Sequence, residues 1–432
     1  MSVVSSLRAH IMHSKQLRSM DSLVVAGWRP RELFAVIRSP RVDTIPYLSY
    51  RMKQAKVSLL IAIAVLPLVL VSCSGTPFSC SGAAQPTGGW SGPVFHDGII
   101  YVGSKDGRVI AINASNREEK WQWPDTTGIR GLIYTTPIVD GDLVCIGTYS
   151  GEVYALNRAD GEYIWVYPPK GEGYIGAVVG SPVIADGIMY ISSSNGKVYA
   201  LNTTNGKRKW ETDHILAGKL WTSPAVMGGT LYVSTLDGHI YEVSLETGEL
   251  LGWSFSAEAG FASSPVVYED HIYVGSFDRY LYSIEIGSNV PTWKFPQQKP
   301  AGHWFWASPI VNEGIVYAGC LDGRLHAIEA ETGEKLWEFD AGSPIISSPI
   351  LMDNLLIIIG ELGTLYVFDV DTEFEEEAVP LRTISIGASV KSSFCAQDGL
   401  VYVRGEDDSI YVADIERGEI VGGWPVSLTT EK

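Results

Sequence analysis

The chain has 432 residues, with 32 Lys and Arg against 49 Asp and Glu, and its formal net charge is −17. From Cys73 onward the imbalance grows, because this part holds 22 basic and 46 acidic residues, a net charge of −24. Nucleic-acid binding requires basic surface that neutralises phosphates, so this balance argues strongly against a nucleic-acid partner. It also disfavours electrostatic docking on anionic lipid.

Residues 1–51 carry scattered arginines and show no periodicity, so they predict neither a domain nor a repeat. A recognisable pattern, with a methionine at its start, begins at Met52. Two interpretations stay open for residues 1–51: an over-extended gene start, or a genuine long segment ahead of a signal sequence.

Residues 52–72 are typical of a secretory signal. The short basic stretch MKQAK (52–56) precedes an uncharged apolar run, Val57 to Val71, that contains Pro67. A membrane-spanning helix needs about 20 apolar residues, whereas this length suits the apolar region of a signal peptide.

The residues around Cys73 read LVSCSG and resemble the lipobox of bacterial lipoproteins. That resemblance implies that Cys73 is lipidated, that residues 73–89 form a tether, and that the protein is exported and anchored to a membrane through its lipid. An uncleaved anchor and a plain secretory signal are the alternatives.

The other four cysteines are far apart in the sequence: Cys80, Cys145, Cys320 and Cys395. They form no CxxC pair, so a disulfide framework or a zinc site is not indicated. The last three lie in apolar, strand-like runs, where a buried thiol that packs as a small hydrophobic group is the default.

Residues 90–428 consist of eight copies of one unit. SGPVFHDGIIYVGSKDGRVIAINASNREEKW (91–121) aligns with TTPIVDGDLVCIGTYSGEVYALNRADGEYIW (135–165). A proline marks the start of seven copies, and a phenylalanine takes its place in the eighth: Pro93, Pro137, Pro182, Pro224, Pro265, Pro309, Pro349 and Phe394. The unit therefore recurs every 40 to 45 residues.

Each copy predicts a small antiparallel sheet. Runs such as IYVGS and VYALN are rich in β-branched and aromatic residues, as strands are. Asp-Gly or Asn-Gly pairs separate the runs, for example Asp97-Gly98, Asp106-Gly107 and Asn195-Gly196, and these pairs accept the positive φ of tight hairpin turns. A last strand beginning near a tryptophan completes four strands per copy.

Four strands every 40 to 45 residues is the period of a β-propeller blade. Radial stacking covers both faces of such a sheet and leaves only short edges. The sequence therefore predicts an all-β fold, an eight-bladed β-propeller of four-stranded antiparallel blades. A linear β-solenoid, the alternative, usually has a much shorter period.

The stretches ALNRADGEYIW, ALNTTNGKRKW and AIEAETGEKLW resemble the tryptophan-docking motif of quinoprotein-type propellers, the quinoprotein alcohol dehydrogenase-like fold. The resemblance implies that each docking tryptophan stacks on the neighbouring blade in a structural role. The candidates are Trp121, Trp165, Trp210, Trp253, Trp293, Trp337 and Trp424. Blade seven departs from the motif, because it has no tryptophan and carries an acidic run, Glu373 to Glu377. A calcium site or a solvated charge run would fit those residues, and the second is the default.

A lipobox followed by eight such blades resembles the BamB family of outer-membrane assembly factors. That resemblance implies a non-catalytic scaffold that binds an envelope protein partner through propeller loops and needs no cofactor. A second hypothesis is a dehydrogenase dependent on pyrroloquinoline quinone (PQQ) and calcium. Those enzymes are implied to need long insertions and often an adjacent cysteine pair, which this sequence lacks. A third hypothesis is a ligand sensor of the envelope.

The segments that enter several blades are aromatic, most of all His303-Trp304-Phe305-Trp306. We expect them at one mouth of the central channel, where they would bind a partner or simply pack between blades. The candidate rim residues are Trp221, Phe261, His303, Trp304 and Trp306. No metal ligand set is expected, because the histidines have no metal-binding spacing.

Overall fold

The computed structural model describes residues 89–125, 129, 132–213, 216–261 and 263–429. The predicted signal segment, Cys73, Cys80 and residues 73–88 of the tether lie outside these residues. Among the described residues, no helix is long and apolar enough to cross a membrane.

The described residues form 33 strands, which follow one another along the chain four to a blade until the last blade. The strands of blades one and two are β1 (Val94–His96), β2 (Ile99–Gly103), β3 (Val109–Asn113), β4 (Glu119–Trp123), β5 (Ile138–Asp140), β6 (Leu143–Gly147), β7 (Val153–Asn157) and β8 (Tyr163–Tyr167). Those of blades three and four are β9 (Val183–Ala185), β10 (Ile188–Ser192), β11 (Val198–Asn202), β12 (Arg208–Glu211), β13 (Ala225–Met227), β14 (Thr230–Ser234), β15 (His239–Ser244) and β16 (Leu250–Ser256). Those of blades five and six are β17 (Val266–Tyr268), β18 (His271–Gly275), β19 (Leu281–Glu285), β20 (Trp293–Phe295), β21 (Ile310–Asn312), β22 (Ile315–Gly319), β23 (Arg324–Glu329) and β24 (Lys335–Asp340). Those of blades seven and eight are β25 (Ile350–Met352), β26 (Leu355–Gly360), β27 (Thr364–Asp369), β28 (Arg382–Ser385), β29 (Cys395–Gln397), β30 (Leu400–Arg404), β31 (Ser409–Asp414), β32 (Glu419–Ile420) and β33 (Val426–Ser427).

Each blade is an antiparallel meander whose strands pair in chain order, except that β33 of blade eight pairs with β31. The first turn of several blades is an Asp-Gly pair with positive φ at both residues, as at Asp97 (49°) and Gly98 (77°). This backbone matches the twist of the strands that it joins, so β1 and β2 pair in register, with Phe95 opposite Ile100. The turn residues thus set the register from which the rest of the blade follows.

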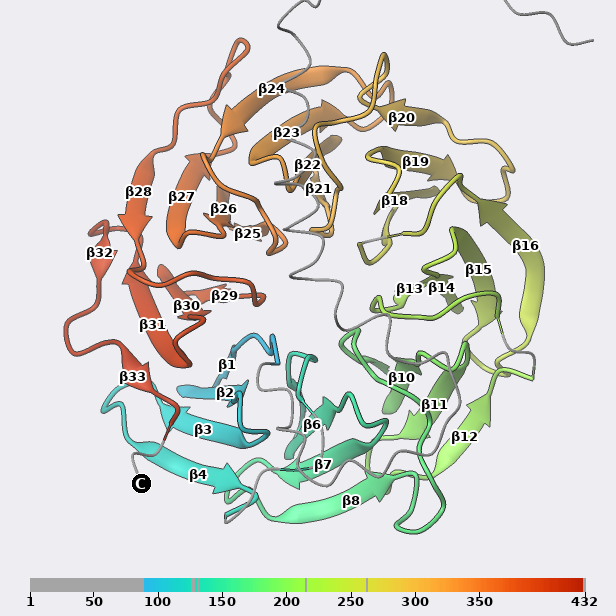
Figure 1. Ribbon diagram of the computed structural model, residues 1–432, viewed down its shortest axis with the longest axis vertical. Helices are drawn as coiled ribbons and strands as arrows, with labels where there is room; N and C mark the ends of the chain where they lie inside the picture. Colours follow the sequence, from blue (N-terminus) through green and yellow to red (C-terminus); the bar gives the residue numbers. More distant parts are fainter. Residues whose placement is uncertain (1–88, 126–128, 130–131, 214–215, 262, 430–432) are drawn as a thin grey trace, which may run out of the picture. The chain divides into compact units, whose positions relative to one another are not determined.

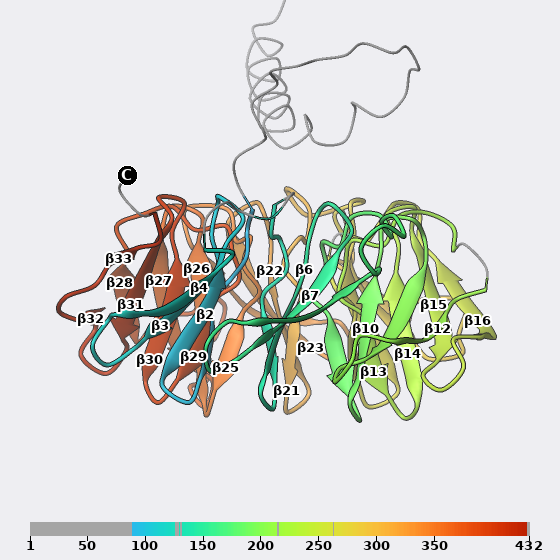
Figure 2. The same ribbon diagram turned by 90° about the horizontal axis from the view of Figure 1, so that it is seen from below.

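The eight blades form a ring (Figure 1), and the predicted eight-bladed propeller is confirmed. The first strand of each blade lies innermost and the last strand lies on the outer edge. Inner strands of neighbouring blades contact one another, for example β13 with β17 and β1 with β29. Figure 2 shows the ring from the side, with its strands running between two faces that carry the turns and loops.

Eight clusters of buried residues hold the ring together, and each combines residues of two neighbouring blades. One cluster joins Tyr101 and Val109 of blade one to Ile146 and Leu156 of blade two. Fully burying a side chain of this size stabilises the fold by about 1.5–3 kcal/mol. Because every blade contributes to two clusters, a blade without its neighbours would expose both apolar faces.

Five tryptophans tie their blade to the next one by an indole N–H that donates to a backbone carbonyl. The bonds run from Trp121 to Arg158, Trp165 to Thr203, Trp210 to Leu245, Trp253 to Ser288 and Trp293 to Ala330, at 2.8–3.2 Å. In four of these seams a glycine with positive φ lies against the indole ring; a Cβ on Gly206, for example, would lie 2.6 Å from Trp165. Glycine is therefore required at this position for two reasons: the positive φ disfavours other residues, and the indole ring leaves no space for a Cβ.

The acidic insertion of blade seven covers the sixth tryptophan, Trp337. Phe374 meets the Trp337 ring edge-on, with centroids 5.4 Å apart, and backbone bonds link Glu338 of β24 to Glu376 and Ala378. The side chains of Glu373 and Glu375 to Glu377 are exposed, in keeping with a solvated charge run. In blade seven itself, Arg382 pairs with Val367 at the position that the tryptophan occupies in other blades.

The ring closes through side-chain and loop contacts between blades eight and one. The outer strand of blade eight comes from β32 and β33 near the C-terminal end. At the inner side, Arg404 and Asp408 form an ion pair of 2.6 Å whose side chains are 2% and 4% exposed. Arg404 also donates to the carbonyl of Gly89 at 2.8 Å, and Asp408 accepts from the backbone N–H of Lys105 at 3.2 Å. The pair thereby joins blade eight to the start of blade one and to its second turn.

Candidate functional site: the aromatic mouth of the channel

One end of the ring carries the connections between blades together with the turns between the second and third strands of the blades. Backbone bonds hold the two sets together, for example from Tyr149 N to Leu132 O and from Leu321 N to Trp304 O. The turns between the first and second strands, such as Asp97-Gly98, lie at the other end because β2 runs from one end to the other. We call the first end the mouth.

Four equivalent positions at the mouth hold large aromatic side chains. They stand three residues before the marker proline of their blade, and each side chain is half-buried: Trp90, Tyr134, Trp221 and Trp306. The residues on either side of them along the chain are mostly buried, such as Ile133 and Thr135 around Tyr134. This alternation turns the aromatic side chains toward the channel.

A layer of hydroxyl groups lies two residues after these aromatic positions in the segments that enter the blades. The backbone N–H of one inner residue donates to the Oγ of its counterpart on the next blade, from Ser223 to Ser264, from Ser264 to Ser308 and from Ser308 to Ser348, each at 3.0 Å. At Gly92 this layer lacks a side chain, and there Ser393 Oγ reaches Thr136 Oγ1 at 2.6 Å. These bonds fix the inner ends of neighbouring blades to one another, so the aromatic side chains stand on a rigid base.

Turn residues complete the rim of the mouth. Phe277, in the turn between β18 and β19, lies against both Trp304 and Trp306, with ring centroids 5.0 and 6.0 Å away. A second aromatic group joins Tyr134 to Trp90 at 5.9 Å and to Tyr149 at 5.4 Å. The equivalent turn residues of blades four, six and seven are also apolar: Leu236, Leu321 and Leu362.

His303 serves the local backbone. Its Nδ1 accepts a hydrogen bond from the N–H of Trp304 at 2.9 Å, and burial lowers the pKa of the imidazole, an effect opposed by Asp322. The hydrogen bond to Nδ1 therefore fixes the backbone of the loop at Trp304. Among the described residues, no group of three or more His, Cys, Asp or Glu side chains is arranged to hold a metal ion.

The structure places Phe261 apart from the other candidate rim residues. Phe261 is fully buried and contacts Phe255 and Tyr282 in the seam between blades four and five. Its counterpart is Phe305, which is also fully buried and packs against Phe295. Both stand four residues before the marker proline, one position earlier than the channel-facing residues, and this offset turns them into the seam.

The candidate docking residue Trp424 also differs from its counterparts. It is half-buried at the seam between blades eight and one, whereas Trp121 and Trp165 are 6% and 7% exposed. Its blade carries extra residues, Gly422 and Gly423, which separate β32 from β33. Among the hydrogen bonds of the described residues, none has the Trp424 indole N–H as donor.

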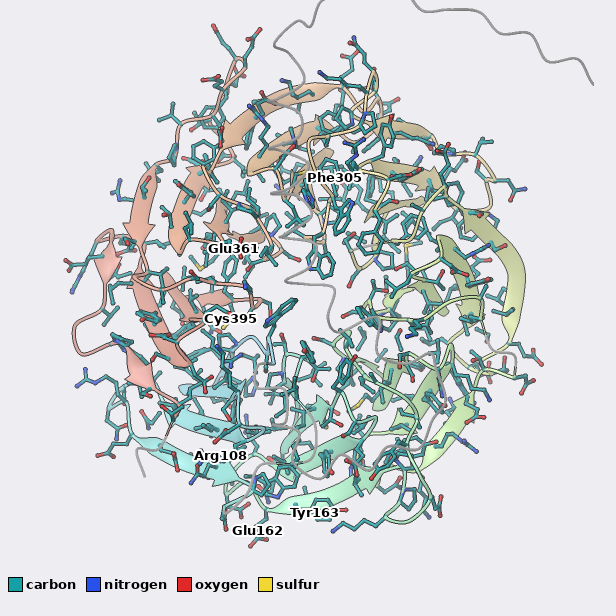
Figure 3. The ribbon with its side chains drawn as sticks, viewed as in Figure 1. Arg108, Glu162, Tyr163, Phe305, Glu361 and Cys395 are labelled. Atoms are coloured by element: carbon teal, nitrogen blue, oxygen red, sulfur yellow. The ribbon has the colours of Figure 1, made fainter. Side chains whose placement is uncertain are left out.

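Charged groups are few in the channel-facing layer. Lys391, at the position equivalent to Trp306, lies between Glu361 and Glu406, with its Nζ 3.7 Å from a carboxylate oxygen of each. In Figure 3, Glu361 and Phe305 lie on the inner side of their blades, whereas Glu162 and Tyr163 lie on the outer edge of blade two. The mouth therefore offers aromatic and apolar contact area with a paired charge cluster on one side.

Trp90, Tyr149 and Phe277 are rim residues that were not among the residues predicted from the sequence. Their signal was the repeat itself: channel-facing residues stand at a fixed distance before the marker proline, and Tyr149 and Phe277 stand in the second hairpin turn of their blades. Aligning all eight copies position by position would have found all three. The Trp221 indole N–H, which is buried and has no partner among the described residues, could not have been anticipated in this way.

A family model described as "Outer membrane protein assembly factor BamB" matches the chain over residues 78–249, 198–338 and 292–373. Together these matches span more than half of the chain. The chain belongs to this family. Its propeller is of the PQQ-like type that the sequence resemblance implied.

Two solved structures share the fold. The crystal structure of BamB from Moraxella catarrhalis has a TM-score of 0.58 and 16% identity, over 74% of this chain and 93% of that one. The computationally designed protein Ika8 has a TM-score of 0.63 and 16% identity, over 75% of this chain and 96% of that one. None of the curated proteins compared with the chain matches it. Because a designed protein shares the fold, the fold by itself implies no particular function.

Proposed function

We propose that this chain is an exported scaffold of the cell envelope that binds a protein partner at its aromatic mouth and catalyses no reaction. One observation carries the proposal: Trp90, Tyr134, Trp221 and Trp306 stand half-buried at equivalent channel-facing positions. Membership of a family described as an outer membrane protein assembly factor supports a partner that takes part in assembling outer-membrane proteins.

The aromatic mouth has the properties of a protein-binding site. Tryptophan and tyrosine dominate the energetics of protein interfaces, where truncating one such anchor often costs 2 kcal/mol or more. The bonded hydroxyl layer below them keeps the anchors in place before the partner arrives, which lowers the entropy lost on binding. Phe277, Trp304 and Leu362 extend the contact area outward along the rim.

Attachment to a membrane through lipid on Cys73 is part of the same proposal. It rests on the signal-like segment, on the LVSC motif and on the family. Mass spectrometry of the mature protein tests it directly: we expect an N-terminal peptide that begins with a diacylglyceryl-modified Cys73. A mature chain that begins elsewhere, or that carries an unmodified Cys73, would contradict it.

Partner binding is tested with a double variant of the mouth, Trp221→Ser with Trp306→Ser. Tagged protein is crosslinked in intact cells, purified from solubilised membranes, and the recovered partner is quantified. Loss of two anchors should reduce recovery at least about tenfold. The matched control, Tyr163→Ser with Val379→Ser, changes two apolar side chains that are 42% and 72% exposed away from the mouth. Equal recovery from both variants would contradict the mouth as the binding site.

The absence of catalysis needs its own test. The purified full chain is titrated with PQQ and calcium, and dye-linked alcohol oxidation is assayed alongside. We expect no turnover. Turnover that depends on both additions would contradict the scaffold and support the dehydrogenase.

A further inference from the structure

An extended segment of the chain itself pairs with the outer edge of blade six. This segment, Glu376 to Ala378 in the insertion of blade seven, runs parallel to β24. Glu338 of β24 donates its N–H to the Glu376 carbonyl at 3.0 Å, and its carbonyl accepts from the Ala378 N–H at 2.9 Å. The residue that follows the docking tryptophan therefore directs both of its backbone groups outward, where they bind an added strand.

The corresponding residue of blade four is Ser254, which follows Trp253. Tyr241 lies opposite Ser254 in blade four, as His326 lies opposite Glu338 in blade six. The N–H and carbonyl of Ser254 therefore also point outward, because the direction of hydrogen bonding alternates along a strand. β16 lies on the outer edge of the ring (Figure 1), and among the described residues no strand pairs with it on that side.

This edge lacks the charged side chains that usually protect an edge strand from pairing with another chain. β16 is the longest of the outer strands, with seven residues, LLGWSFS, and none of them is charged. Leu250 and Leu251 are 40% and 51% exposed, and Ser254 and Ser256 are exposed as well. In every other blade except blade two, the outer strand carries Lys, Arg, Asp or Glu.

The outer strand of blade two, β8, is protected in another way. Val166, the residue after its docking tryptophan, is only 9% exposed. Pro168 and Pro169 directly follow the strand and have no N–H to donate. Lys170 also lies over the Tyr163 ring, with its Nζ 5.4 Å from the ring centroid. The outer edge of blade four is therefore the uncharged edge that stays open.

Carboxylates flank this uncharged edge. Glu249 precedes β16 and is exposed, and Glu258 follows it with a side chain that is 82% exposed and 3.8 Å from Lys294 Nζ. A second copy of this chain would bring the same carboxylates to both ends of the strand, and the like charges would oppose pairing of two β16 strands. A strand with Lys or Arg at its ends would meet opposite charge instead.

We propose that the outer edge of β16 binds an extended segment of a partner polypeptide, namely an uncharged strand with Lys or Arg at its ends. Backbone hydrogen bonds to an edge strand give affinity, and the flanking charges select the partner. The register shifts between Tyr241 and Val243, so the added strand pairs with residues 253–256, and its apolar side chains contact Leu250 and Leu251. The site is independent of the mouth and goes beyond the function proposed for it.

The test uses the purified full chain and a fluorescent peptide, KKTVTVTKK, followed by fluorescence anisotropy. We expect a dissociation constant on the order of 100 μM at low salt, which rises with ionic strength. The peptide EETVTVTEE should bind at least about tenfold more weakly. An analogue that is N-methylated on both valines keeps one hydrogen-bonding edge and should bind within about threefold of the parent. An analogue that is N-methylated on all central residues has no free edge and should not bind.

Variants locate the site. Ser254→Pro removes an outward N–H that the ladder with β15 does not use, and it should weaken peptide binding at least about tenfold. The matched control is Thr383→Pro, which changes the corresponding residue of β28, opposite Tyr366, and should bind as the wild type does. Glu249→Gln with Glu258→Gln leaves the backbone unchanged and should weaken binding about fivefold.

Three results would overturn the proposal. The first is binding of the fully N-methylated peptide as tightly as the parent, or no binding of the parent up to about 1 mM. The second is unchanged binding in Ser254→Pro, or an equal loss in Thr383→Pro. The third is a wild-type dimer in sedimentation equilibrium that Ser254→Pro dissociates, because a second copy would then occupy the edge. The mouth variant Trp221→Ser with Trp306→Ser should bind the peptide normally, which separates this site from the mouth.

Discussion

Replacing Arg404 by methionine should weaken the junction at which the ring closes. The guanidinium and the Asp408 carboxylate are 2% and 4% exposed, so the variant leaves a carboxylate buried without its partner. Removing one member of a buried pair typically costs about 3–5 kcal/mol. The backbone N–H of Lys105 still reaches Asp408, while the carbonyl of Gly89 loses its donor. We therefore expect a loss of about 4 kcal/mol in the free energy of unfolding.

The assay is a thermal or urea unfolding curve of the purified protein. For a ring of this length, that loss corresponds to a fall in Tm of roughly 4–7 °C. A second variant, Arg404→Gly with Asp408→Gly, gives blade eight the residues that blade two has at the equivalent positions, Gly147 and Gly151. It removes both charges, so it should regain at least half of the lost stability. An Arg404→Met variant whose free energy of unfolding is within about 1 kcal/mol of the wild type, or a double variant less stable than the single one, would show that the buried ion pair does not stabilise ring closure.

Three further predictions follow from the seams. Gly206→Ala should lower the free energy of unfolding by about 2–4 kcal/mol, because its φ of 67° is unfavourable for alanine and its Cβ would strike Trp165 at 2.6 Å. The control Gly141→Ala, with φ of 56° and no atom within 4 Å, should cost only about 1 kcal/mol, and equal losses in urea unfolding would contradict the role of the ring. Burial lowers the pKa of His326 from 6.5 to about 4, so between these pH values the imidazole is protonated in the unfolded chain and neutral in the native chain. The free energy of unfolding should therefore fall by up to about 3 kcal/mol as the pH falls from 6.5 to 4. His326→Phe should remove that part of the pH dependence, and an unchanged pH profile of stability would contradict the prediction. Burial raises the pKa of the Cys145 thiol to about 12. Alkylation by iodoacetamide at pH 8, followed by peptide mass spectrometry, should therefore be about 1,000-fold slower in the native protein than in urea. Comparable alkylation rates would contradict a buried, neutral thiol.

The repeat made the fold predictable because every level of the sequence agrees. The marker prolines, the Asp-Gly turns and the alternating apolar runs each recur in most of the eight copies, and together they indicate short antiparallel strands. The docking tryptophans add a contact between one copy and the next. A pattern with one inter-blade contact per copy specifies neighbours in space, and from there the ring follows.

Ring closure could not be predicted because it depends on departures from the repeat. Arg404 stands where the other blades have glycine or serine, apart from Ile359 of blade seven, and Asp408 stands where all of them have glycine except blade five, which has Arg279. In a single sequence the two residues look like ordinary substitutions. Their meaning comes from burial, which brings the two charges together beside Gly89. Trp424 presents the same difficulty. Arg117 stands where other blades have a glycine under the indole ring, and it belongs to the first blade whereas Trp424 belongs to the last.

The candidate site was only partly predictable for a geometric reason. Phe261 and Trp221 are both aromatic residues in blade-entry segments, yet a shift of one position sends Phe261 into a seam and Trp221 toward the channel. Side chains alternate between two directions along an extended segment, so composition alone does not separate the two roles. The number of residues between the aromatic residue and the marker proline does separate the two roles.

Binding of a partner at the mouth is tested most directly by site-specific photo-crosslinking in intact cells. A photoreactive phenylalanine analogue replaces Trp306 at the mouth, and Tyr163 on the outer edge of blade two as the control. A partner bound at the mouth should give one discrete crosslinked product from position 306, which is lost when Trp221→Ser is added, and none from position 163. Crosslinks to a discrete partner from position 163 alone would contradict the mouth as the binding surface.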